Sequence, residues 1–192
     1  MNRTKKLNHP IIIGVGQITH REKIKEDKLS ALDLACQAIN ASVADTERGD
    51  LLNYVDSLSV VNISVESMNH PEESICRKLR FHPAVREQTA VSGSSPQWLI
   101  NRAADKIMAG EIKMALLVGA EALYRDKRAP NSFDDDNWDV VLSYLQNDPS
   151  IVGDTHLGST PHENLYGADH ARHVYPLFEN ALRGHLQMNV RD

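Results

Sequence analysis

The stretch that decides the fold is TAVSGSSPQWLINRAADKIMAGE, residues 89–111. It begins with β-forming residues, passes through a turn of serine and glycine, and continues with apolar residues at helical spacing. Pro96 suits the first turn of a helix, where an amide N–H would lack a helical partner in any case. Gly110 favours the left-handed conformation that ends a helix. The stretch therefore predicts a strand, a tight turn and a helix in direct succession.

The flanking sequence repeats this alternation of strand and helix. Pro71, followed by two glutamates, suits the start of an upstream helix. An earlier helix has Asp27 or Ser30 available to cap its free amides. The predicted elements are strands at residues 11–17, 55–65, 85–91 and 114–120, and helices at residues 29–44, 71–81 and 96–109. This order predicts a wound α/β architecture with right-handed crossovers.

The composition of the sequence changes beyond residue 122, and the regular alternation of strands and helices ends there. Five of the nine histidines lie there, together with three consecutive aspartates at residues 134–136 and scattered glycine and proline. We expect residues 1–122 to form the α/β domain and residues 123–192 to form an inserted loop or lid region. A terminal helix is predicted to begin at Pro176.

Composition argues against several classes of function. The net charge of −5 gives no electrostatic basis for binding nucleic acid. No apolar run approaches the roughly 20 residues that span a bilayer. Cys36 and Cys76 are too few and too far apart for a disulfide framework or a zinc cluster, and both lie at apolar positions of predicted helices. We therefore expect a soluble cytoplasmic protein with two reduced, buried thiols.

Residues 89–111, with the apolar run that follows and Glu121 after it, resemble the catalytic strand, turn and helix of the thiolase superfamily. In that family a strand delivers a nucleophilic cysteine to the amino terminus of a helix that ends in Ala-Gly-Glu. The segment YPLFENALR, residues 175–183, resembles a subgroup of acetyl-CoA acetyltransferases and thiolase-like proteins whose turn lacks that cysteine. The resemblance implies the amino-terminal half of a thiolase, with a mixed sheet, a buried central helix, and coenzyme A or an acyl-CoA as ligand.

Gly93 occupies the position of the nucleophilic cysteine when the helix is aligned with that of the family. A helix amino terminus lowers the pKa of a thiol and stabilises a developing anion, which is why a nucleophile belongs there. Glycine has no side chain that accepts an acyl group. Ser92, Ser94 and Ser95 flank it, but a serine nucleophile needs an adjacent general base, and no histidine neighbours this turn in the sequence. The resemblance therefore places the candidate site on these four residues.

Two functions follow from the resemblance. In the first, the chain is part of an acyltransferase whose acid and base come from a carboxy-terminal half that is missing here. In the second, which we favour, the chain is a non-catalytic module that binds a coenzyme A thioester or mediates assembly. Self-association is also expected, because a helix and strands that are apolar on all sides would leave a large exposed patch on a monomer.

A metal site is a third class of function. It is suggested by four histidines in the carboxy-terminal region, His156, His162, His170 and His173. No cysteine lies near them, so we interpret them as solvent-exposed loop residues and expect no metal.

We predict that the purified protein catalyses neither thiolysis of acetoacetyl-CoA nor condensation of acetyl-CoA, because Gly93 carries no nucleophile. The loss of acetoacetyl-CoA absorbance and the release of free CoA thiol measure the two reactions. Turnover above the protein-free rate that disappears in Ser94→Ala would contradict this prediction.

Overall fold

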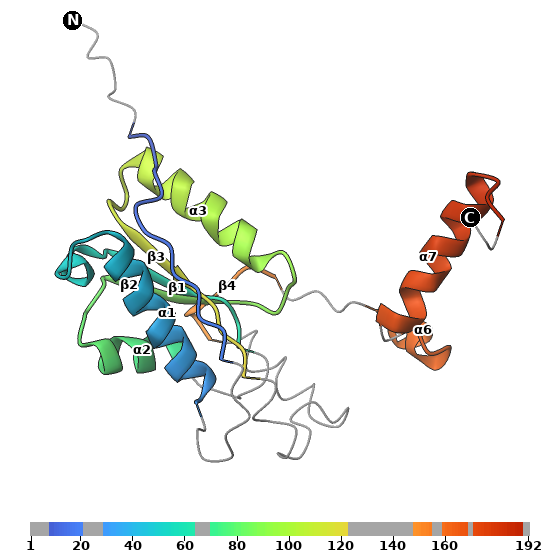
Figure 1. Ribbon diagram of the computed structural model, residues 1–192, viewed down its shortest axis with the longest axis horizontal. Coiled ribbons are helices and arrows are strands. Elements are labelled where there is room, and N and C mark those ends of the chain that lie inside the picture. Colours follow the sequence, from blue (N-terminus) through green and yellow to red (C-terminus); the bar gives the residue numbers. More distant parts are fainter. Residues whose placement is uncertain are drawn as a thin grey trace, which may run out of the picture. The chain divides into compact units, whose positions relative to one another are not determined.

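The computed structural model describes residues 8–20, 29–63, 70–122, 148–154, 159–168 and 171–189. The chain divides into two compact units, residues 1–155 and residues 156–192. In the first unit, helices lie on both faces of a single sheet (Figure 1). The aspartates at residues 134–136 lie outside the described residues.

The sheet has four described strands in the order β3-β1-β2-β4. They are β1 (Ser57–Val60), β2 (Val85–Thr89), β3 (Ala115–Val118) and β4 (Ile151–Val152). Every described pair is parallel, with Ser57 opposite both Val85 and Ala115. The predicted α/β class is confirmed, and an antiparallel strand of the expected mixed sheet is not among the strands described. β4 comes from beyond residue 122, so the predicted loop region contributes one strand to the sheet.

Two helices, α1 (Ala31–Asp45) and α2 (Pro71–Leu79), cover one face of the sheet. Successive side chains of a strand point to opposite faces, so Leu58 and Val60 of β1 both enter this layer, where they are completely buried. They pack with Ile39 of α1 and Ile75 of α2 in the apolar core. Cys36 and Cys76 are also buried in this core as free thiols, as predicted.

Local signals explain where α1 and α2 begin and end. Ser30 caps α1 in a capping box: its hydroxyl accepts the amide of Asp33 at 3.0 Å, and the Asp33 carboxylate accepts the amide of Ser30 at 2.8 Å. Pro71 opens α2, and Arg80 closes it in the left-handed conformation. A 3-10 turn, η1 (Leu51–Tyr54), leads from α1 into β1.

The third helix, α3 (Ser95–Ala109), lies on the opposite face of the sheet (Figure 1). Its start and its end at Gly110, which has a φ of 77°, agree with the prediction. The prediction of a buried central helix is wrong, because only Ser95 and Leu99 are buried. Trp98, Ile100 and Met108 are 38%, 46% and 43% exposed. The helix packs on the sheet through one side, and none of the described residues buries its other side.

Residues 11–17 were expected to form a buried first strand, and this expectation is also wrong. The segment is extended but pairs with no described strand, and Ile11 and Ile12 are 77% and 79% exposed. It runs beside α1 instead, where the amide of Val15 donates to Asp45 Oδ2 at 2.9 Å. Its glycines allow this close approach, since a Cβ on Gly14 would lie 2.5 Å from the carbonyl oxygen of Ser42.

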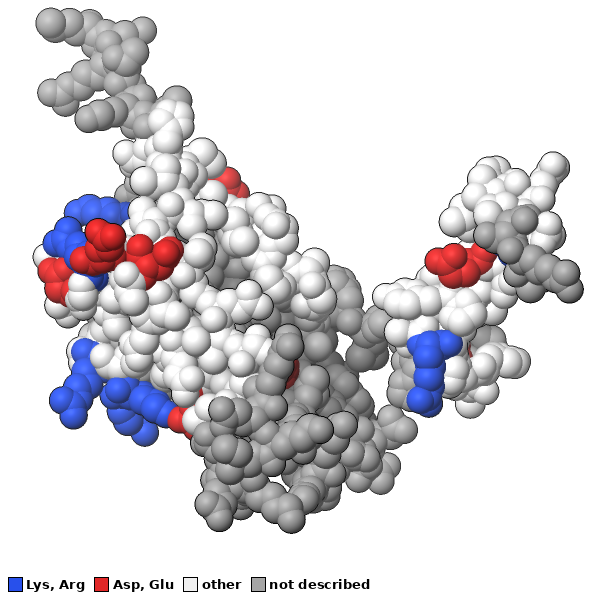
Figure 2. Space-filling model, viewed as in Figure 1, with Lys and Arg blue, Asp and Glu red and all other residues white. Residues whose placement is uncertain are grey.

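On the face of the first unit that Figure 2 shows, the charged side chains gather toward the margins.

The second unit contains the short helix α6 (Pro161–Leu165) and α7 (Ala171–His185). α7 begins five residues before the predicted start, and Pro176 lies inside it. Tyr175, Phe178 and Leu182 recur at helical spacing across the proline, so the amphipathic pattern continues although Pro176 has no amide to donate. These apolar side chains are exposed. In the described part of the chain, no helix is both long and apolar enough to cross a membrane.

The capping carboxylate of Asp33 also joins α1 to α2, because the Lys78 ammonium donates to it. This hydrogen bond, with those from Ser30, lowers the pKa of Asp33 from 3.8 to about 2. The folded state thus holds its proton less tightly than the unfolded chain. The resulting stability is present above about pH 4 and is lost as the pH falls toward 2.

We predict that Asp33→Ala lowers the free energy of unfolding by about 1 kcal/mol at pH 7, mainly through the lost cap, because the ion pair is partly exposed. Urea unfolding at pH 7, 5 and 2.5 measures this difference, which should shrink at the lowest pH. The exposed Asp105 of α3 provides the control, since Asp105→Ala should change stability by less than about 0.5 kcal/mol. If the loss in the free energy of unfolding caused by Asp33→Ala were the same at all three pH values, the lowered pKa of Asp33 would not be the source of this stability.

Candidate functional site

The four predicted site residues lie together between the carboxyl end of β2 and the amino end of α3, as expected. Gly93 and Ser94 form the turn, Ser94 is the N-cap of α3, and Pro96 lies in its first turn. In wound α/β sheets, the carboxyl ends of the strands are where ligands bind.

Hydrogen bonds among the serines shape this turn. The Ser92 hydroxyl accepts the amide of Ser94 at 3.3 Å and lies 3.0 Å from the Ser94 hydroxyl. Ser95 is buried, and its hydroxyl donates to the Ala90 carbonyl at 3.2 Å. No histidine in the described part of the chain hydrogen-bonds to any of these hydroxyls. The serines therefore act as turn formers, and none is held as an activated nucleophile.

Gly93 is exposed, and its backbone does not require glycine. A Cβ built on it would meet no atom within 4 Å, and its φ is outside the left-handed region. A cysteine would therefore fit at this position. The shape of the turn therefore does not require glycine at the position where the resemblance predicts a cysteine.

The amino end of α3 retains the polar character of an anion site. The Ser94 side chain makes no capping hydrogen bond to the helix amides. The first amides of a helix have no helical acceptor, and together they carry about half a positive charge. A carbonyl oxygen or anion at the turn would be favoured by this end of α3.

Glu87 of β2 holds α3 on the sheet, and the sequence analysis did not single it out. Its buried carboxylate accepts the Ser59 hydroxyl at 2.9 Å, and Arg102 Nε and Lys106 Nζ of α3 approach it at 3.4 and 3.5 Å. The Arg102 guanidinium also lies 5.3 Å from the centre of the Trp98 ring. The sequence did contain a signal for this contact, because Glu87 lies inside a predicted strand. A carboxylate buried in a sheet requires a cationic or hydrogen-bonding partner nearby.

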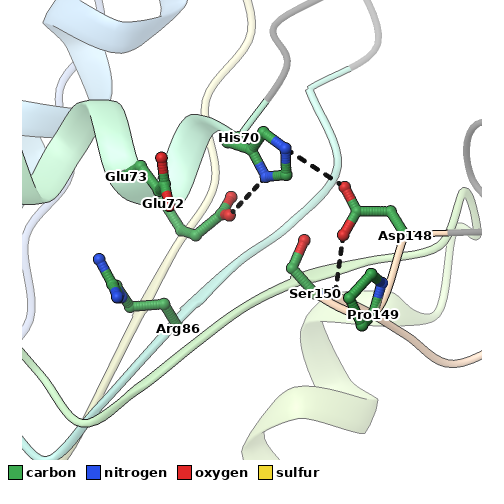
Figure 3. Close-up of a pocket in the computed structure, with 7 residues that line it drawn as sticks. All are labelled: His70, Glu72, Glu73, Arg86, Asp148, Pro149 and Ser150. Atoms are coloured by element: carbon green, nitrogen blue, oxygen red, sulfur yellow. Dashed lines mark hydrogen bonds and ion pairs between the residues drawn. The ribbon is translucent and has the colours of Figure 1, made fainter.

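A second polar group of residues lies at the amino end of α2 (Figure 3). His70 Nδ1 lies 3.2 Å from Glu72 Oε1, and His70 Nε2 lies 3.5 Å from Asp148 Oδ2. Sequence reasoning missed this group because Asp148 is distant in the chain, and only the parallel pairing of β4 with β2 brings it close.

Only two of the four histidines considered for a metal site, His162 and His173, lie among the described residues. His156 and His170 lie outside the described residues. His162 packs against the Tyr166 ring, and His173 Nδ1 lies 2.8 Å from the Gly167 carbonyl. Among the residues whose positions are described, no group of three or more His, Cys, Asp or Glu side chains is arranged to hold a metal ion.

Among solved structures, the chain is similar to the crystal structure of a monomeric SCP2-thiolase-like protein type 1 from Mycobacterium smegmatis. The sequence identity is 28% and the TM-score is 0.52, over 60% of this chain. The fold is thiolase-like. The chain spans only 24% of the length of that protein. No family model and no curated protein matches the sequence.

We predict that Gly93→Cys folds normally and adds one fast-reacting thiol, because the position is open and lies at a helix amino terminus. Cys36 and Cys76 are internal controls, since burial raises the pKa of both thiols. Titration of the folded Gly93→Cys variant with a chromogenic disulfide should detect one thiol that reacts at least about tenfold faster than Cys36 and Cys76. A new thiol as slow as the buried pair would show that this turn is closed.

Proposed function

We propose that the turn at residues 92–95 binds the thioester end of an acyl-CoA without forming a covalent acyl intermediate. The observation that carries this proposal is the open space at Gly93, at the amino end of α3, in a thiolase-like fold. An acyl-enzyme requires a side-chain nucleophile, which Gly93 does not have. Binding requires only space and hydrogen-bond donors, and the turn offers both.

The thioester carbonyl is the part of the ligand that suits this turn. Its oxygen carries partial negative charge, and the amide end of α3 favours such a group. The hydroxyls of Ser92 and Ser94 contact each other at 3.0 Å, so one of them donates to the other and the accepting hydroxyl keeps its own O–H for a ligand. We infer that the thioester carbonyl lies over Gly93, with the acyl group in the space that a cysteine side chain would otherwise fill.

Assembly with another protein segment is the second candidate function. It is favoured by the exposed apolar side chains of residues 11–18 and by the exposed side of α3. The similar protein from Mycobacterium smegmatis is described as monomeric. Two partners are conceivable in such an assembly: a carboxy-terminal half that completes the fold, and a second copy of this chain. Because the similar protein is monomeric, we favour the carboxy-terminal half.

We predict that acetyl-CoA binds the wild-type protein and that Gly93→Asp weakens this binding at least about tenfold, because the new carboxylate repels an anionic ligand at the turn. The space at Gly93 accommodates the side chain, and an aspartate is compatible with a helix amino end, so the fold should persist. Isothermal titration calorimetry measures the dissociation constants.

Gly93→Asn is the matched control for this experiment, because it adds the same volume without charge. It should stay within about threefold of the wild type. The proposal is wrong if millimolar acetyl-CoA gives no binding heat with the wild-type protein, or if Gly93→Asp binds as tightly as Gly93→Asn.

A further inference from the structure

Trp98 is a large apolar residue that stays accessible in the first turn of α3. It is 38% exposed, whereas its helical neighbours Ser95 and Leu99 are buried. An accessible tryptophan is a common anchor for an apolar group, because its ring offers a large and rigid contact area. Outside α3, the ring is bordered by Gly153, the residue that follows β4.

The ring of Trp98 lies beside the turn at residues 92–95, which we call the serine turn. The Trp98 amide donates to the Ser94 carbonyl at 3.0 Å, so Trp98 stands one helical turn after Ser94. Long side chains of an α-helix lean toward its amino end and cover the preceding turn. This direction brings the indole of Trp98 toward the serine turn.

The carboxyl end of β4 closes the other side of this region (Figure 1). The Ser95 hydroxyl donates to the Ala90 carbonyl at 3.2 Å, and the Ala90 amide donates to the Val152 carbonyl at 2.9 Å. These two hydrogen bonds connect the serine turn with the end of β4, where Gly153 is the next residue. A Cβ on Gly153 would lie 3.7 Å from the Trp98 ring, so glycine borders the ring with backbone alone.

The ring is held in place by the charged contact beneath α3. The Arg102 guanidinium lies 5.3 Å from the centre of the Trp98 ring, and its Nε approaches the buried Glu87 carboxylate at 3.4 Å. A cation over an aromatic ring is attractive, so Arg102 limits the movement of the indole. A ring that is already fixed loses little freedom when a ligand covers it.

The chemistry of the ring selects one part of an acyl-CoA. The acyl chain and the pantetheine arm both extend from the thioester. The pantetheine arm contains amide groups, which lose hydrogen bonds to water when they lie on an apolar surface. The acyl chain has no such groups and gains free energy when it leaves water. The acyl chain is therefore the better match for Trp98.

We propose that Trp98 binds the acyl chain and makes the site prefer chains longer than acetyl. This inference rests on the acyl-CoA function proposed above. With the thioester carbonyl over Gly93, an acetyl group ends at the serine turn, and further methylenes extend onto the ring of Trp98. Each methylene that leaves water strengthens binding, so Trp98 determines specificity for chain length.

Calorimetric titration of the wild-type full chain with acetyl-CoA and hexanoyl-CoA tests the proposal. The additional methylenes of hexanoyl-CoA should make its dissociation constant at least about tenfold smaller than that of acetyl-CoA. Equal dissociation constants would overturn the role of Trp98 and leave the acyl-CoA site in place. The absence of binding by both esters would overturn the two proposals together.

Trp98→Ala should weaken hexanoyl-CoA binding at least about tenfold and acetyl-CoA binding less than about threefold, because only the longer chain reaches the ring. Ile100→Ala is the matched control. Ile100 is 46% exposed on the same helix but lies about 200° around its axis from Trp98, so this variant should keep the preference for hexanoyl-CoA. Equal weakening of both esters by Trp98→Ala would place the ring against the coenzyme A part and would overturn the proposal.

NMR of the 15N-labelled wild-type chain provides a second test that does not depend on how well Trp98→Ala folds. The indole N–H peak of Trp98 is distinguished from that of Trp138 by its loss in Trp98→Phe. Saturating hexanoyl-CoA should shift this peak more than saturating acetyl-CoA does, because the longer chain covers the ring. A shift with hexanoyl-CoA that is no larger than the shift with acetyl-CoA would overturn the proposal.

Discussion

The buried carboxylate of Glu87 is the constraint on which the α3 side of the structure depends. Glu87 lies on β2, beneath α3, with the Ser59 hydroxyl beside it and Arg102 and Lys106 above it. An uncompensated buried carboxylate is strongly unfavourable, so the two cationic residues must lie over the sheet. They sit one helical turn apart on α3, and this spacing orients the helix. The turn at residues 92–95 begins that helix, so its position follows from the same interaction.

The two faces of the sheet are held by different forces. On the α1 and α2 face, Leu58 and Val60 enter an apolar core that also holds both cysteines. On the α3 face, the neighbouring positions of β1 are Ser57 and Ser59, and the charged contact of Glu87 lies there in addition to the buried Leu99. Burial of apolar surface stabilises the first layer without regard to direction, whereas the charged contact fixes the position of α3. This division explains why α3 is well placed although few of its residues are buried.

The turn at residues 92–95 combines three features: a strand end, a helix amino end and open space at Gly93. None of its described hydroxyls is paired with a histidine, so the turn holds no activated nucleophile. Recognition of a polarised carbonyl depends on helix amides and space, whereas attack on it depends on one side chain, and this difference underlies the binding function that we propose.

The sequence alone determined the elements whose signals are local. Pro71 as a helix start and Gly110 as a helix end are each specified by the conformational preferences of a few neighbouring residues, and Ser30, the cap of α1, was one of two candidates that the sequence offered. The position of the candidate turn followed from the same kind of signal, and so did the α/β class. Only the tertiary structure decided that residues 11–17 lie beside α1, that one side of α3 is exposed, and that Asp148 meets His70. These outcomes depend on which distant segments pair and cover one another, and neither hydrophobic periodicity nor turn chemistry carries that information.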